Sequence, residues 1–456
     1  MDAVTKARTR LRMYPRLIAE CRHEGKIYAS CVASQEDIKQ NACVNEFQQF
    51  RNCVLRAAVK LGTNIGLLIR ILLCIYSNFH DKYFKVAYTD VDYKVFTYAA
   101  RDVIAQRSPY DQQAYRYSPL IAYLFTPNVL LHPICGKIIA SIFDVYLAYR
   151  IYRIVLLTFN NPKKALQCAQ IWLYAPLSII ICTRGNVDSI SSVFILLALL
   201  YHLKEQYVWS GVLLAVSVHL RLYPIIFLLP FLVTCNQFSS VDRLKYTYKS
   251  KLTFLASFVV TVAALTGAFY YIYGYKFINA SVLFHVSRQD IKHNFSLYSY
   301  LQYLDAYVPE TVSKNFVLDS NLTKNLVIIL PSVALQLAIT IKYNTLKHLP
   351  FNLFCSAFVF VILNKVLTAQ YFIWFFSLLP VFLPSIVLST KKVAAIIGTW
   401  IGMQALWLFA AYLLEFEGYD TFIYVHACSL LFYFVNVWIL VTFINTYNAQ
   451  YVKKVD

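Results

Sequence analysis

Two carboxylates stand two positions apart in the segment Tyr88-Thr-Asp-Val-Asp-Tyr93. If this backbone is extended, Asp90 and Asp92 project to the same side, because alternate side chains of a strand share a face. Such a pair could hold a divalent cation, or one member could act as general base on a sugar hydroxyl. The alternative is a solvated turn, since a D-x-D pattern is short and common. The two acids are the first candidates for catalysis.

Arginine and tyrosine residues follow the acids in two short motifs, Arg107-Ser-Pro-Tyr110 and Tyr115-Arg-Tyr-Ser-Pro119. The planar guanidinium group matches the oxygens of a phosphate. The two motifs therefore predict a site for an anionic phosphate, formed by Arg107 and Arg116 together with Tyr110 and Tyr117. The alternative is a belt of Tyr and Arg that anchors the chain at a membrane interface.

More polar residues stand at the ends of apolar segments. Arg184-Gly-Asn186 precedes such a segment, and the free N–H groups at a helix start can hold an anion. Arg221 separates two apolar segments, where an ionisable residue indicates a function, unless its side chain snorkels to the interface. On one membrane face these groups would favour a phosphate-bearing ligand. The full set comprises Arg184, Asn186, Arg221, Tyr223, Arg288, His293, Asn294, Gln370 and Tyr371.

The composition shows what must position these residues. The chain has 456 residues, of which 59% are hydrophobic and 14% charged, whereas soluble domains are about 25% charged. This excludes a water-soluble protein. The net charge is +19, but the basic residues are scattered over many short loops, whereas a nucleic-acid-binding protein gathers them in one patch. We predict a polytopic membrane protein with no nucleic-acid partner.

A hydrocarbon core of about 30 Å needs about 20 apolar residues per helix. On that basis we predict an all-α, polytopic bundle of about twelve spans. The candidate spans are residues 61–79, 134–158, 165–182, 188–203, 207–220, 222–234, 252–275, 322–342, 349–364, 371–389, 393–414 and 422–447.

Basic loops orient this bundle, because cytosolic loops carry the excess of Lys and Arg. The alternation predicts cytosolic termini and places the long loops 80–133 and 276–321 together on the opposite face. Long loops that hold polar residues favour a surface enzyme over a channel. Lys453 and Lys454, near the C-terminus, match a dilysine retrieval signal for the endoplasmic reticulum; plain positive-inside charge is the alternative.

The first sixty residues are polar and contain four of the eleven cysteines. Cys21 and Cys31 have nine residues between them, as do Cys43 and Cys53. On a helix each pair is roughly 80° apart and near one face. Two antiparallel helices could then form the bridges Cys21–Cys53 and Cys31–Cys43. Zinc ligation is disfavoured, because zinc pairs usually have two to four residues between them. We therefore predict two units, residues 1–60 and 61–456.

From about residue 61 onward the chain resembles the PIG-M family, the first mannosyltransferases of glycosylphosphatidylinositol (GPI) synthesis. The matching stretches, in family order, are Tyr88–Tyr93, Arg107–Tyr110, Tyr115–Pro119, Arg184–Asn186, Leu222–Pro224, Arg288–Ser296 and Thr368–Phe372.

The resemblance implies a multispanning GT-C glycosyltransferase of the endoplasmic reticulum. Such an enzyme transfers mannose from dolichol-phosphate-mannose to glucosaminyl-phosphatidylinositol on the lumenal leaflet, with inversion to an α-1,4 product. Asp90 or Asp92 would take the proton, while Arg and amide groups steady the leaving phosphate. No cofactor is required; a divalent cation at the two acids is left open. The family also implies a small, PIG-X-like accessory subunit.

The first sixty residues resemble instead a twin C-x9-C protein of the CHCH class, similar to a mitochondrial complex I assembly factor. Such proteins fold by oxidation, but disulfides do not persist in a reducing cytosol. We therefore expect a fused or read-through gene model that joins two separate products. An alternative is that the relevant unit is the cysteine module, an assembly protein with the membrane part appended. A lipid or solute transporter is the other alternative; it predicts inverted repeats and broken helices, and we see no internal repeat.

Overall fold

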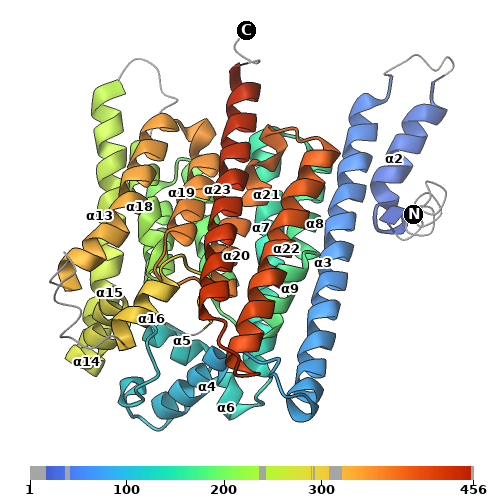
Figure 1. Ribbon diagram of the computed structural model, residues 1–456. Coiled ribbons are helices and arrows are strands. Elements are labelled where there is room, and N and C mark those ends of the chain that lie inside the picture. The colour runs from blue at the N-terminus through green and yellow to red at the C-terminus, as the bar shows by residue number, and fades with distance from the viewer. Residues whose placement is uncertain are drawn as a thin grey trace.

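The computed structural model describes residues 17–35, 42–235, 243–288, 290, 293–307 and 321–452. These residues form helices joined by turns and loops, with no strand among them (Figure 1). The prediction of an all-α fold is therefore confirmed. The dilysine pair, Lys453 and Lys454, lies outside the described residues.

Four helices of the described chain are long and apolar enough to cross a membrane. They are α3 (Val44–Tyr83), α13 (Arg243–Tyr273), α22 (Thr390–Glu415) and α23 (Phe422–Val452). A fifth candidate is broken into α8 (Pro162–Leu173) and α9 (Pro176–Thr183), which meet at 49°. The break precedes Pro176, because a proline cannot donate to the preceding turn.

Helices that are too short, or too rich in charged residues, to meet the same criterion occupy the remaining predicted spans, so the number of crossings stays a prediction. Prolines again begin or interrupt several of these helices. They are α7 (Cys135–Phe159), α10 (Asp188–Leu203), α11 (Tyr207–Leu220), η2 (Tyr223–Phe227), α12 (Leu228–Val233), α18 (Asn321–Lys342), α19 (Leu349–Ile362), α20 (Phe372–Phe376) and α21 (Leu379–Phe382).

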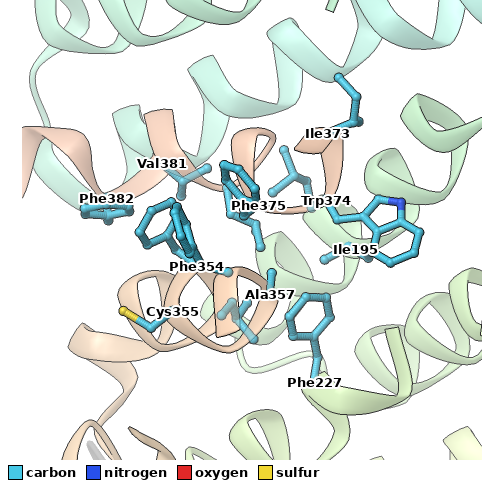
Figure 2. Packing of buried hydrophobic residues seen from close by; sticks show 14 of the residues in the cluster. Ile195, Phe227, Phe354, Cys355, Ala357, Ile373, Trp374, Phe375, Val381 and Phe382 are labelled. Carbon is cyan, nitrogen blue, oxygen red and sulfur yellow. The ribbon is translucent and has the colours of Figure 1, made fainter. Parts of the chain in front are cut away.

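The main hydrophobic core lies around α19, nearly all of whose side chains are buried. A helix that is apolar on all sides belongs inside a bundle or within lipid, and here other helices enclose it. Figure 2 shows its aromatic packing: the ring of Phe354 lies 4.6 Å from that of Phe382, and Phe375 packs beside them.

A buried ion pair fixes α3 to this bundle. Arg70 of α3 contacts Asp144 of α7 at 2.6 Å, and both side chains are fully buried. Arg70 also donates to the carbonyl of Leu173, and Ser189 donates to Asp144. The side-chain partners are spread over three helices, so hydrogen bonds from distant segments offset the cost of burying the charges.

The two long loops meet at one end of the bundle (Figure 1). This end, here called the loop end, contains α4 (Val91–Ile104), α5 (Pro119–Leu124), α6 (Pro127–Leu130), α14 (Tyr275–Ile278), α15 (Phe284–Ser287) and α16 (Ser299–Tyr307). The opposite end, here called the terminal end, contains α2 (Arg22–Ala33) and the last turns of α23.

At the terminal end, α2 packs against the first part of α3. Disulfides join Cys21 to Cys53 and Cys31 to Cys43, the pairs that the cysteine spacing predicts. The unit boundary predicted near Lys60 falls inside α3, which continues from this hairpin into the first apolar span without a break.

Candidate active site

Asp90 caps the first turn of α4. Its backbone is extended, and its carboxylate accepts a hydrogen bond from the Asp92 N–H at 3.2 Å. The Asp90 N–H donates to the Arg184 carbonyl at 3.0 Å, and the Asn186 side-chain amide lies 3.5 Å from the Asp90 carboxylate. The Arg184-Gly-Asn186 motif therefore lies beside Asp90. The extended arrangement considered for both acids holds for Asp90 only, because Asp92 lies in the first turn of α4.

Asp92 connects two segments that are distant in sequence. The Tyr117 hydroxyl donates to Asp92 Oδ2 at 2.6 Å, and the Gln370 amide donates to the same oxygen at 3.4 Å. Three of the predicted motifs thus meet at one carboxylate oxygen.

The protonation of Asp90 is set by opposing effects. Burial and the neighbouring Asp92 carboxylate raise the pKa of Asp90, whereas Arg184 and the hydrogen bonds from Asp92 and Asn186 lower it. The net shift is upward. A carboxylate with a raised pKa is a stronger base, which suits proton abstraction from a hydroxyl group.

Arg221 is held inside the molecule and does not snorkel, since its side chain is only 11% exposed. Its Nε lies 2.9 Å from Asp188 Oδ1, and its guanidinium covers the Tyr117 ring at 4.9 Å. The indole N–H of Trp374 donates to the same Asp188 oxygen at 3.0 Å. Asp188 therefore holds Arg221 against the tyrosine that binds Asp92.

An aromatic stack completes this wall. The Trp374 ring lies 3.9 Å from Tyr223 and 4.0 Å from Tyr371, with nearly parallel planes. The Tyr371 hydroxyl accepts a hydrogen bond from Arg288 at 3.3 Å, and Arg288 also pairs with Asp290. Tyr223, Tyr371 and Arg288 thus reach the same place from three separate segments.

These side chains line a cavity of about 400 Å³. Six sequence candidates contribute to its wall: Arg116, Tyr117, Arg221, Tyr223, Arg288 and Tyr371. Arg116, Arg221, Arg288 and Lys365 supply four cationic groups, and apolar residues such as Val262 and Phe360 line other parts of the wall. The cavity therefore suits an anionic group that is joined to an apolar chain.

Sequence reasoning did not select His285, Lys365 or Trp374 as site residues, although all three line the cavity. Burial and the arginines around it lower the pKa of His285, so its imidazole favours the neutral form. Lys365 stands in a short loop between apolar segments, and no recognisable motif surrounds it in the sequence. Trp374 has the sequence signature of a core residue.

Nine of the fifteen candidates do not line the cavity. Asp90, Asp92, Arg184, Asn186 and Gln370 form the contacts around the acids described above, and four others remain. Arg107 pairs with Asp102 at 2.8 Å, and its side chain is 61% exposed. Tyr110 is buried next to the site and donates to the Tyr117 carbonyl at 2.9 Å. Tyr110 therefore supports the segment that carries Tyr117, whereas Arg107 is held on the surface by Asp102.

The other two belong to the loop after Arg288. His293 pairs with Glu415 at 2.7 Å. Asn294 is buried, and its amide donates to the carbonyls of Asp290 and Lys365 while accepting from the Leu367 N–H. Its hydrogen-bonding groups are used in joining two loops, so its role here is to position Lys365.

The acid pair is a poor fit for a metal centre formed by the protein alone. In the described chain, close groups of three His, Cys, Asp or Glu ligands occur only at the cysteine pairs of the hairpin. Asp90 and Asp92 also accept hydrogen bonds from different neighbours. The chemistry proposed below therefore uses the carboxylates alone.

Comparison with known proteins shows which family the chain belongs to. A family model described as "Mannosyltransferase (PIG-M)" matches residues 181–444. GPI mannosyltransferase 1 of Dictyostelium discoideum is 38% identical over 413 residues, which cover 86% of this chain and 93% of the relative. The catalytic subunit of GPI alpha-1,4-mannosyltransferase I of Danio rerio is 34% identical, with 88% and 98% covered. GPI mannosyltransferase 1 of Saccharomyces cerevisiae is 35% identical, with 84% and 94% covered. The chain belongs to the PIG-M family of mannosyltransferases.

Proposed function

We propose that this chain transfers the first mannose of the GPI anchor, in α-1,4 linkage, from dolichol-phosphate-mannose to glucosaminyl-phosphatidylinositol. It is a multi-pass membrane glycosyltransferase, and its relatives carry the names GPI mannosyltransferase 1 and GPI alpha-1,4-mannosyltransferase I. Broken helices also occur in transporters, but membership of this family favours the enzyme.

The observation that carries the proposal is the position of the basic cavity next to the acids. Tyr117 forms part of the cavity wall and also donates to Asp92. A donor phosphate near Arg116, Arg221 and Arg288 would therefore place its sugar close to the carboxylates. Membrane lipids and the isoprenoid chain of the donor would meet the apolar part of the wall.

The reaction we propose is a single displacement. Asp90 or Asp92 accepts the proton of the acceptor 4-hydroxyl while that oxygen bonds to the anomeric carbon of mannose. The bond between this carbon and the phosphate oxygen breaks, and dolichol phosphate leaves with the electron pair. Cationic groups of the cavity stabilise the negative charge that develops on the leaving phosphate.

Complementation of cells that lack the activity tests this assignment. We expect Asp90→Ala and Asp92→Ala to reduce the surface display of GPI-anchored proteins strongly. Asp111→Ala is the matched control, because Asp111 pairs with Lys276 on an exposed surface at the same end of the molecule. Full restoration by both Asp90→Ala and Asp92→Ala would refute the catalytic role of the acids.

An assay of the purified enzyme tests the substrates themselves. Dolichol-phosphate-mannose is supplied with glucosaminyl-phosphatidylinositol or with other mannosyl acceptors, and the product linkage is determined. Transfer to the glucosamine acceptor in α-1,4 linkage supports the proposal. Transfer that prefers a mannosylated acceptor would contradict it.

We further propose that the enzyme resides in the endoplasmic reticulum, with cytosolic termini, a lumenal cavity and a small accessory subunit. The basic loops and the dilysine pair Lys453 and Lys454 support the location. The resemblance to the PIG-M family supports the subunit. Pull-down of the full chain after mild solubilisation, followed by identification of small membrane proteins, tests the subunit.

For residues 1–60 we propose a CHCH-like unit that a fused or read-through gene model has joined to the enzyme, so that the two parts are separate products. The two bridges of the α2–α3 hairpin support this reading. Transcript mapping and a search for N-terminal peptides by mass spectrometry test it. A single native polypeptide that carries both parts would refute the read-through origin.

A further inference from the structure

A groove of about 730 Å³ lies between α3 and α7, toward the terminal end of the bundle. The proposed reaction does not use it, since none of its residues lines the catalytic cavity. Its wall combines basic, tyrosine and aliphatic side chains of these two helices.

The chemistry of this wall changes along the bundle axis. On α3, the lining residues Arg56, Lys60, Thr63 and Leu67 share one face and extend over about 16 Å. Helix α7 runs in the opposite direction, because α3 descends to the loop end and α7 returns from it (Figure 1). The basic part of the α3 face therefore lies beside the last turns of α7. Leu67 lies near the middle of α7, because Arg70, one turn further along α3, pairs with Asp144.

Residues of α7 show the same gradient. Ile142 and Val145 line the groove nearer the loop end, and Tyr149, Tyr152 and Arg153 line it nearer the terminal end. A neighbouring cavity shares Arg56, Tyr152 and Leu156 with the groove, which places Arg56 beside the last turns of α7. The groove thus has an apolar part and a basic, tyrosine-rich part.

The basic part carries an excess of positive charge. Lys60 pairs with Glu20 at 3.1 Å. Within the described ranges no carboxylate forms an ion pair with Arg56 or Arg153, and Arg153 donates to the Tyr149 hydroxyl at 3.0 Å. Cationic side chains at the end of an apolar groove match an anion that is attached to a hydrocarbon chain.

We propose that this groove binds an anionic phospholipid of the leaflet at the terminal end. Its phosphate would lie against Arg56, Lys60 and Arg153, and one acyl chain would follow Leu67, Ile142 and Val145. The substrate lipids of the proposed reaction would act at the loop end, so this lipid is distinct from them. Arg56 and Lys60 belong to residues 1–60, so the site requires a polypeptide that carries both parts of the chain, as the continuous helix α3 does. In that polypeptide the headgroup would join the hairpin to the bundle.

Thermal unfolding of the purified full chain in lipid nanodiscs tests the proposal. We expect phosphatidylserine nanodiscs to raise the Tm by about 2–4 °C over phosphatidylcholine nanodiscs, as a bound ligand does. The double variant Arg56→Gln/Arg153→Gln should lose most of this increase. Lys164→Gln, an exposed basic residue at the start of α8, should keep it.

A second variant separates the acyl chain from the phosphate. Val145→Trp fills the apolar part of the groove and leaves the basic part intact, so it should also lose the increase. Inorganic phosphate in phosphatidylcholine nanodiscs should give no comparable increase. The proposal is overturned if phosphate reproduces the effect, if both lipids stabilise equally, or if Arg56→Gln/Arg153→Gln responds like Lys164→Gln. The rate of mannosyl transfer, measured for each variant in phosphatidylcholine nanodiscs, tests the proposed function separately. A variant that loses mannosyl transfer does not by itself change the difference in Tm between the two lipids.

Discussion

Asp188 illustrates how a residue outside the cavity can control the reaction. Its buried carboxylate accepts a hydrogen bond from the Trp374 indole and pairs with Arg221. The guanidinium of Arg221 in turn lies over the ring of Tyr117. We predict that Asp188→Asn lowers kcat/KM by about 100-fold, because a small displacement of a positioning group can cost that much. Asp188→Glu keeps the charge and should restore most of the activity. Steady-state kinetics with the purified enzyme measure both.

The pair of variants separates charge from packing. Asp111→Asn, on the exposed surface, serves as the control for a lost carboxylate. If Asp188→Glu is as inactive as Asp188→Asn while both fold, then fit in the core outweighs the charge, and the positioning role is wrong.

The raised pKa of Asp90 leads to a prediction about pH. The base must be deprotonated to act, so kcat/KM falls as the pH drops through its pKa. Because the pKa of Asp90 is raised, this fall should begin above the range of an ordinary carboxyl group, which is about 4. Arg184→Gln removes a cation that favours the charged form, and should move the fall to still higher pH. Profiles of kcat/KM against pH for both enzymes test this. An identical profile for Arg184→Gln would show that Asp90 is not the titrating group.

Residue types and spacing predicted six residues of the cavity wall. They did not distinguish these residues from similar ones on the nearby surface. Arg116, Arg221 and Arg288 line the cavity, whereas Arg107 and His293 look equally suitable in the sequence. Arg107 and His293 are held on the surface, where their side chains are 61% and 70% exposed: Asp102 pairs with Arg107, and Glu415, which is 122 positions away, pairs with His293. A distant partner of this kind leaves no local sequence signal.

At the scale of elements, the ion pair of α3 and α7 gives a stability prediction. Arg70→Met leaves Asp144 buried without its cation, which costs about 3–5 kcal/mol. We expect a clear fall in the Tm of the detergent-solubilised chain. A double variant, Arg70→Met/Asp144→Leu, removes both charges and should recover much of the loss. A double variant as unstable as Arg70→Met would show that shape, and not the unpaired charge, is responsible.

Apolar length predicted where the helices lie, but not which helices lie inside. Helix α19 is enclosed by other helices, whereas α22 exposes most of its side chains. Both are predominantly apolar in the sequence and lack the polar stripe that marks a soluble surface helix, because lipid and protein interior are both apolar environments. The break before Pro176 lies inside the single predicted span 165–182, although a proline interrupts the hydrogen bonds of a helix.

At the scale of the whole molecule, the two ends of the bundle should face different compartments. Lys85 stands in the exposed turn before α4, and Lys164 is exposed at the start of α8. In cells whose plasma membrane alone is permeabilised, an impermeant thiol reagent should label Lys164→Cys but not Lys85→Cys. Disruption of all membranes should expose both, with the unsubstituted chain as the background. The opposite pattern would invert the proposed orientation.

This orientation has a consequence for the cystine hairpin. The helices bring Cys21 to Cys53 and Cys31 to Cys43, with Cα atoms 5.8 and 6.1 Å apart. A cytosolic hairpin would nevertheless hold these four residues as thiols, because the cytosol is reducing. We predict that a maleimide mass tag modifies all four in freshly lysed cells without prior reduction. Ser substitutions of the four cysteines supply the matched control, since they remove the tagged sites and leave the bundle cysteines unchanged. Protection of the four until a reductant is added would place the hairpin in an oxidising compartment, and the termini could then not be cytosolic.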